Sequence, residues 1–302
     1  MAKKNRFDEL IEKRKRLDKK KSDAFQHQIE IHRREYEDEW RTDASYFSQI
    51  GAYDWMCQSL NGLKSILEVG CGVGYSTLAL ATRGYQVVSV DENPYCCYAA
   101  AKLIENSKFD VTQIHRGKVN AISEDVYSQR FDPIQLGTLE KQITILDGDV
   151  IFDQNLKDWL KTVGPFDAVI CWLIGTNHAR QFVEDRKRLP WRNDGEYRLR
   201  VQNSSYKLAD SILRVGGILN IVDRGQTPTG EKREMLILDD IASHHEQAEG
   251  TSLEVDPNSI RHLPYEHDKI KHGKKMVLTL GESSEVPDRL ELSLRTISAI
   301  KK

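Results

Sequence analysis

The sequence predicts an α/β fold: a doubly wound, mostly parallel sheet with helices on both faces and an N-terminal helical extension. From residue 45 to about 222, short apolar runs alternate with helical segments, which is typical of a parallel sheet covered on both sides. A glycine-rich turn, GCGVG, follows the first of these runs. Residues 1–44 are highly charged and contain neither glycine nor proline, which favours one long helix.

Composition limits the class of protein. With 302 residues and 39% hydrophobic content, we expect a charged helical arm at 1–44 and one domain at 45–302. The net charge is -2, and no apolar run approaches the roughly 20 residues that cross a bilayer. The N-terminus also lacks the apolar stretch of a secretory signal. We therefore expect a soluble, cytoplasmic protein without a membrane partner.

The arm contains a basic run, KRKRLDKKK at 13–21, which leaves two kinds of partner open. Leu10, Leu17, Ala24 and Ile31 recur every seven residues, but polar residues at the accompanying positions weaken the case for a coiled coil. A basic helix can also contact nucleic acid through its phosphates. We expect self-association or nucleic-acid contact through this arm, unless the run is only a solvated face.

Five apolar runs predict the parallel strands: SILEV (65–69), QVVSV (86–90), QITIL (142–146), FDAVICW (166–172) and GILNIV (217–222). Helices are predicted between them, with Asn93 and Pro94 opening one at PYCCYAAAKLIEN. Past residue 225, EKREMLILDDIASHHEQ reads as a helix, whereas SIRHLP and KKMVLTL read as strands. The run RLELSLRTI suits a strand or a helix.

Two connections, 107–141 and 175–194, are longer than usual, and we expect them to form substrate-side loops. The five cysteines are odd in number and contain no CxxC pair, so neither a disulfide framework nor a zinc site is expected. His262, His267 and His272 recur every five residues, a spacing that suits neither one face of a helix nor one side of a strand. No metal is predicted.

The glycine turn indicates a ligand that lies directly on the main chain. A glycine-rich turn between a first parallel strand and its helix lets a ligand approach the backbone at the carboxyl edge of the sheet. The dinucleotide fingerprint has a third glycine where this chain has Tyr75. A pyrophosphate-binding turn is therefore disfavoured.

The residues around this turn resemble the first motif of the class I S-adenosylmethionine-dependent methyltransferases, a Rossmann-like family. An acidic residue stands two positions before a G-x-G-x-G turn, here Glu68, Gly70, Gly72 and Gly74. Further features of the family follow in order: an acid ending the second strand, Asp91; a polar residue after the third, Asp149; and a glycine pair at the fifth, Gly216 and Gly217. The ordered set covers residues 65–222, with the cofactor half at 65–150.

The resemblance implies roles for these residues toward S-adenosylmethionine. Asp91 would accept both ribose hydroxyls, Asp149 the adenine amino group, and the amide of Val150 would donate to the ring. Asp147 is an alternative to Asp149, and Glu68 would orient the cofactor or the turn. The remaining cofactor contacts that we expect are Cys71, Glu92 and Trp172.

Catalysis by this family depends mainly on positioning a nucleophile, so no universal catalytic residue is expected. The segment at the carboxyl end of the fourth strand, CWLIGTNHAR, has neither the N-P-P-Y-like motif of base-amine methyltransferases nor metal-binding carboxylates. It does offer His178 as a general base and Asn177 beside it. The residues that we expect to contact the substrate are Tyr53, Arg180, Trp191 and Asp223.

We expect a methyltransferase that moves a methyl group to a small molecule or a nucleic acid. Loop arginines such as Arg180 favour an anionic acceptor. Two other functions stay open: a non-catalytic S-adenosylmethionine-binding sensor or partner subunit, and an NAD-linked oxidoreductase, which Tyr75 disfavours.

Overall fold

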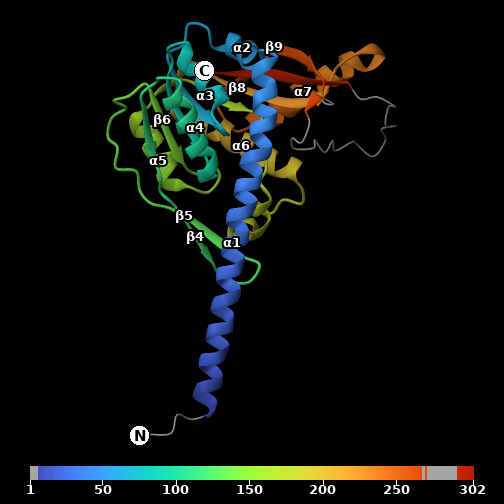
Figure 1. Cartoon of the computed structure of the whole chain (residues 1–302). Coiled ribbons are helices and arrows are strands. Elements are labelled where there is room, and N and C mark those ends of the chain that lie inside the picture. The colour runs from blue at the N-terminus through green and yellow to red at the C-terminus, as the bar shows by residue number, and fades with distance from the viewer. Residues whose placement is uncertain (1–5, 267–268, 271–290) are drawn as a thin grey trace.

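A computed structural model describes residues 6–266, 269–270 and 291–302, and it confirms the doubly wound α/β fold (Figure 1). Within these residues the main sheet has the strand order β3-β6-β2-β1-β7-β8-β10-β9. β1 (Ser65–Val69) lies at the centre, parallel to β2 (Gln86–Asp91) and β7 (Phe166–Trp172). The strand order reverses across β1, which places the carboxyl ends of β1, β2 and β7 around one crevice.

The outer strands complete this sheet. β6 (Ile143–Asp147) and β3 (Val111–Ile114) extend it in parallel on one side, and β8 (Leu213–Gln226) pairs in parallel with β7 on the other. β10 (Leu292–Lys301) and β9 (Leu253–Tyr265) finish this second side in antiparallel pairing. The ambiguous run at 289–297 is therefore a strand over its described part. β8 begins earlier than expected, so Gly216 and Gly217 lie inside it.

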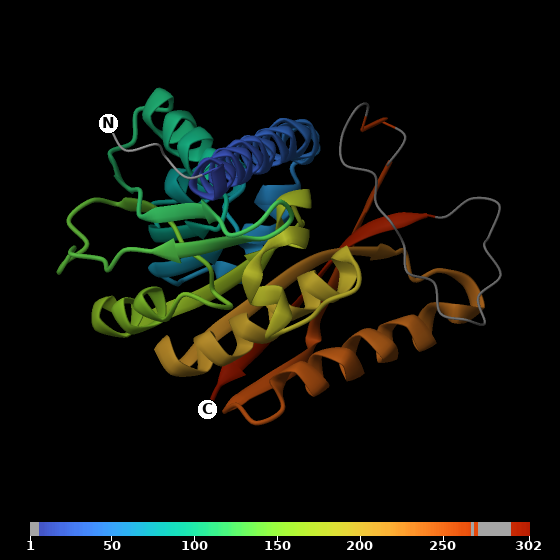
Figure 2. The same cartoon turned by 90° about the horizontal axis from the view of Figure 1, so that it is seen from below.

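Helices cover both faces of the sheet, as predicted (Figure 2). α2 (Ala52–Cys57), α3 (Tyr75–Thr82) and α4 (Pro94–Asn106) lie on one face together with α1. α5 (Gln154–Val163), α6 (Asp194–Ile212) and α7 (Arg233–Ala248) lie on the other. Asn93 caps α4 by accepting a bond from the Tyr95 amide, as its place before Pro94 suggests. α5 was not predicted, although Asp153 caps it in the same way.

The predicted substrate-side loops contain structure of their own. The segment 107–141 forms β3 and a hairpin of β4 (Gly117–Ala121) and β5 (Tyr127–Phe131). Their half-exposed residues lack the continuous apolar run of a central strand, which is why the sequence pattern did not reveal them. The segment 175–194 contains two short 3-10 helices, η2 (His178–Phe182) and η3 (Glu184–Lys187).

α1 runs without a break from Arg6 to Gln49 and crosses the body of the molecule beside the hairpin and the glycine turn (Figure 1). The predicted boundary between arm and domain at residue 44 falls inside this helix. One stripe of it is buried, with these members: Phe25, Ile29, Arg33, Trp40, Asp43, Ala44 and Phe47. α1 is thus packed against the body from Phe25 onward.

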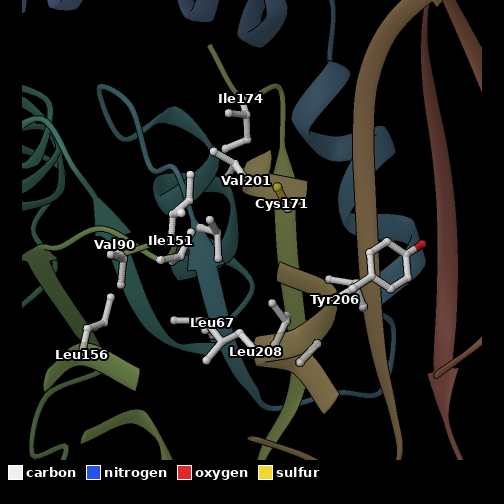
Figure 3. Close-up of a cluster of buried hydrophobic side chains, with 14 of the residues drawn as sticks. Leu67, Val90, Ile151, Leu156, Cys171, Ile174, Val201, Tyr206 and Leu208 are labelled. Atoms are coloured by element: carbon white, nitrogen blue, oxygen red, sulfur yellow. The ribbon is translucent and has the colours of Figure 1, made fainter. Parts of the chain in front are cut away.

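The core has two parts, one on each face of the sheet. Figure 3 shows the part under α6, where Val201 and Leu208 of that helix meet Leu67 of β1 and Cys171 of β7. Among the described segments, none combines the length and the apolar character of a bilayer-crossing helix. The predicted strand KKMVLTL, together with His267 and His272, lies outside the described residues.

Candidate functional site

The glycine turn leaves its backbone open to close approach. Gly70, Gly72 and Gly74 have φ values of 80°, 50° and 91°, which side chains other than glycine rarely adopt. A Cβ atom on Gly70 would collide with the Ile174 side chain, and one on Gly72 with the Trp40 indole. At Gly74 it would lie 2.7 Å from the Ala100 Cα. The first two glycines face the crevice, whereas Gly74 allows α3 to pack against α4.

Asp91 stands at the end of β2, directly beside this turn. Its Oδ2 accepts a hydrogen bond from the Gly72 amide at 3.0 Å, and its Oδ1 accepts one from the Asn93 amide at 2.9 Å. A carboxylate oxygen can accept two hydrogen bonds, so each oxygen keeps capacity for a ligand. Burial, followed by the nearby charge of Glu92, raises the pKa of Asp91 to about 7.

A cavity of about 60 Å³ lies between the turn and the carboxyl ends of four strands. Its polar lining residues are Tyr36, Trp40, Asp91, Glu92, Asp149, Asn177 and Tyr197. The charged members of this lining are all carboxylates. At roughly 10–15 Å³ for one water by this measure, the cavity holds a few waters and is smaller than a nucleoside joined to an amino acid. The side chains of Trp40, Tyr36 and Ile174 narrow it.

Asp149 lines this cavity but has several partners already. Its Oδ1 accepts hydrogen bonds from the Ile151 amide at 2.8 Å and the Phe152 amide at 3.3 Å. Its Oδ2 forms an ion pair with the Arg180 guanidinium at 2.6 Å, and both side chains are almost completely buried. One acceptor position on Oδ2 is left for an adenine amino group. Asp147, the alternative, accepts bonds from the amides of Arg116 and Gly117 and does not line the cavity.

Two acceptor atoms near the cavity have no hydrogen-bond partner among the described residues: Asn177 Oδ1 and Glu92 Oε2. The Asn177 amide group donates to the Glu92 carboxylate, which joins the ends of β7 and β2. Glu92 Oε2 also lies 4.0 Å from the Arg33 guanidinium of α1 and 3.9 Å from that of Arg180. These atoms could accept bonds from ligand N–H or O–H groups.

Arg180 separates this cavity from a second, polar cleft of about 460 Å³. The second cleft lies between β5, the start of α5 and η3, and it shares Asp149 with the first. Arg130 and Arg188 line it together with acidic residues. The remaining loop arginines are engaged elsewhere, Arg186 with the Trp191 carbonyl and Arg192 with Glu196. No loop arginine among the described residues lines the first cavity, so the structure adds no support for an anionic acceptor there.

Three predicted cofactor residues, Glu68, Cys71 and Trp172, do not line the first cavity. The Glu68 carboxylate accepts hydrogen bonds from the Thr77 and Ser89 hydroxyls, both at 2.6 Å, and burial raises its pKa. Cys71 is buried, with its thiol 3.6 Å from the Gly72 carbonyl. The Trp172 indole donates to Asn220 inside the sheet. Glu68 therefore links β1 to α3 and β2 on either side of the turn, and its expected roles toward the cofactor or the turn stay predictions.

The predicted catalytic pair is split. Asn177 lines the cavity, whereas His178 is exposed and packs edge-on against His32 of α1 at 4.7 Å between ring centroids. Of the predicted substrate residues, Tyr53 stacks on Tyr75, and Trp191 is buried under Tyr197. Asp223 pairs with Arg198 and Gln202 of α6. None of these three lines the first cavity, and their roles remain predictions.

Sequence reasoning missed the contribution of α1 to the site. Tyr36 and Trp40 reach the cavity from this helix, and Gly175 makes room for the Tyr36 ring as Gly72 does for Trp40. Both aromatic residues are on or beside the buried stripe of α1, three and seven positions after Arg33. The apolar spacing of that stripe was the available signal, but the dense surrounding charge hid it.

Comparison with known proteins supports the resemblance seen in the sequence. Residues 67–134 match a family model described as a methyltransferase domain, and this stretch contains the glycine turn and Asp91. The resemblance to class I S-adenosylmethionine-dependent methyltransferases is confirmed, without an identified subfamily, and the fold is the Rossmann-like methyltransferase fold. A search of curated proteins finds no match.

Several solved structures are similar at low identity. YcgJ from Bacillus subtilis is 11% identical with a TM-score of 0.45, covering 83% of this chain and 97% of its own. A putative sarcosine dimethylglycine methyltransferase from Galdieria sulphuraria is 10% identical with a TM-score of 0.42, and the match covers 84% of this chain and 86% of that protein. A methyltransferase from Methanosarcina mazei is 13% identical with a TM-score of 0.40, covering 78% and 92%. At these TM-scores the similarity says nothing about what this chain binds.

Proposed function

We propose that this chain is an S-adenosylmethionine-dependent methyltransferase whose cofactor lies in the cavity beside the glycine turn. The observation that carries the proposal is the juxtaposition of Gly70, Gly72 and Asp91, with acceptor capacity left on both oxygens of the carboxylate. The match of residues 67–134 to a methyltransferase domain supports the same assignment.

The residues present fit this cofactor in type and in position. Asp91 would accept the two ribose hydroxyls, the Val150 amide would face the adenine ring, and Asn177 or Glu92 would accept further ligand N–H or O–H groups. Asp149 contributes less than the resemblance implies, because Arg180 already neutralises it. The size of the cavity requires Trp40, Tyr36 or Ile174 to shift when the whole cofactor enters.

The chemistry of this site depends on positioning. When bound, S-adenosylmethionine supplies a methyl group that is already electrophilic on its sulfonium. The chain would hold the acceptor in line near the end of β7, and the aromatic side chains of Tyr36 and Trp40 would exclude water. The acceptor is a small molecule or a nucleic acid, and any general base must come from the cavity lining or from the acceptor's surroundings.

A second candidate is a protein that binds the cofactor without transferring its methyl group. The lining of the first cavity contains no histidine, lysine or cysteine among the described residues, and its three carboxylates are already bonded to the turn, to Asn177 or to Arg180. Mass spectrometry of S-adenosylhomocysteine with pooled candidate acceptors separates the two functions. A transferase accumulates this product, whereas a sensor retains cofactor affinity without forming it.

The Asp91→Ala substitution tests the proposed site. The substitution removes the charged acceptor of the two expected hydrogen bonds from the ribose hydroxyls. Cofactor binding should therefore weaken by about 2 kcal/mol, or roughly 30-fold in Kd. Titration calorimetry with S-adenosylmethionine measures the effect, and Asp110→Ala, at an exposed carboxylate, is the matched control. Equal affinity in both variants would show that Asp91 does not hold the ribose. Tighter binding of NAD than of S-adenosylmethionine would favour the oxidoreductase instead.

A further inference from the structure

The distal part of α1 projects beyond the body of the molecule (Figure 1). The helix begins at Arg6, and its first buried side chain among those described is Phe25. At about 1.5 Å per residue, the segment 6–24 forms a rod of roughly 28 Å. We call this segment the projecting arm. Near its inner end it meets the body, where Lys21 pairs with Glu124 in the turn of the hairpin.

The projecting arm contains a dense group of cations. Residues 13–21 include seven lysines or arginines and one aspartate. The described members are all exposed, and they are Arg14, Arg16, Lys19, Lys20 and Lys21. Nine helical residues span roughly 13 Å, which gives about one cation per 2 Å, denser than the roughly one phosphate charge per 3.4 Å along a single nucleic-acid strand.

Like charges face one another within this run. Arg16 and Lys19, and Arg16 and Lys20, are three and four positions apart, so their like charges face each other on the helix surface. Each such pair destabilises an isolated helix by a few tenths of a kcal/mol. Asp18, four positions from Arg14 and three from Lys21, offsets part of that cost. A polyanion would remove the repulsion and release its own counterions.

The surface of the arm fits a nucleic acid better than a membrane or a second copy of the chain. Membrane-surface helices need an apolar face opposite their cations, but the basic run 13–21 contains a single apolar residue, Leu17, which is 51% exposed. A coiled-coil seam would need apolar partners at Arg14 and Lys21, where cations stand instead. Phosphates require only accessible cations.

Charge is segregated along α1, which confines the contact to its distal end. The acidic residues Glu35, Glu37, Asp38 and Glu39 lie where the helix crosses the body. We propose that the projecting arm is a docking site for nucleic acid, bound through its phosphate backbone. This inference is independent of the proposed methyl transfer. Lys20 in the basic run lies roughly 24 Å along α1 from Tyr36 at the cavity, so a bound polymer would lie about that far from the cavity.

Charge reversal in the full-length protein tests the proposal. The arm variant is R16E/K19E/K20E, and the control variant, with the same change in net charge, is K207E/K232E/R233E at exposed positions of α6, η4 and α7. The readout is fluorescence anisotropy of a short labelled single-stranded RNA, titrated at salt concentrations between about 50 and 200 mM. Circular dichroism and cofactor calorimetry establish that both variants are folded.

We expect the wild-type protein to bind the RNA with an affinity that falls steeply with salt. Loss of three phosphate contacts should lower the slope of log K against log salt by about 2, and should weaken binding roughly tenfold or more at low salt. The control variant should bind like the wild type. Absence of RNA binding by the wild type, or equal losses in the two variants, overturns the proposal. Loss of a dimer in sedimentation of the arm variant, without RNA binding by the wild type, would assign the arm to self-association.

Discussion

Asp91 shows how one residue combines structural and ligand-binding roles. Its carboxylate fixes the glycine turn through the Gly72 amide and the start of α4 through the Asn93 amide. Asp91 also lines the cavity. Because burial raises its pKa to about 7, the folded chain holds this proton more tightly than the unfolded chain does. The contribution of Asp91 to the free energy of unfolding therefore falls as the pH rises from about 4 to about 7.

The raised pKa also predicts how cofactor affinity depends on pH. Two ribose hydroxyls need an ionised acceptor, and that form of Asp91 predominates only above a pH of about 7. Affinity for S-adenosylmethionine should increase about tenfold between pH 6 and pH 8, following the ionised fraction. Calorimetry across this range measures the dependence. The Asp91→Asn variant cannot ionise at this position, so its affinity should lose the tenfold dependence on pH. If the variant keeps a dependence of the same size, another group is responsible for it.

At the scale of elements, the glycines of the turn have different functions that the sequence could not separate. All three stand at alternate positions, which led to a single interpretation, a ligand lying on bare backbone. The structure assigns Gly70 and Gly72 to the crevice and Gly74 to the contact between α3 and α4. Their partners, Ile174, Trp40 and Ala100, come from distant parts of the chain. The spacing of the glycines therefore does not predict these contacts.

Substitution of Gly74 should therefore destabilise the fold. Gly74→Ala combines a strained φ of 91° with a Cβ atom 2.7 Å from the backbone of α4. Gly84→Ala is the matched control, because its φ is 79° and no atom lies within 4 Å of the added Cβ. We expect a loss of about 1 kcal/mol at Gly84 from strain alone and roughly 2–4 kcal/mol at Gly74. Urea denaturation measures both; equal losses would mean that the contact with α4 costs nothing.

For the molecule as a whole, the sequence predicted the parts whose signal is local. Strands buried on both faces are continuous apolar runs, and caps such as Asn93 mark helix starts, so the sheet and most helices could be located. The hairpin β4–β5 was missed because its residues alternate weakly between exposed and half-buried positions. The placement of Tyr36 and Trp40 was missed because it depends on α1 crossing the sheet. That tertiary contact has no signature in the glycine motif.

The central claim is that a cofactor binds between the glycine turn, Asp91 and α1. Hydrogen exchange measured by mass spectrometry, with and without S-adenosylhomocysteine, tests it most directly. We predict slower exchange in the presence of the ligand at residues 69–74, 90–93 and 148–151, together with a change in segment 36–44 of α1, where Tyr36 and Trp40 lie. Protection confined to the second cleft around Arg130 and Arg188, or no protection at saturating ligand, would contradict the account.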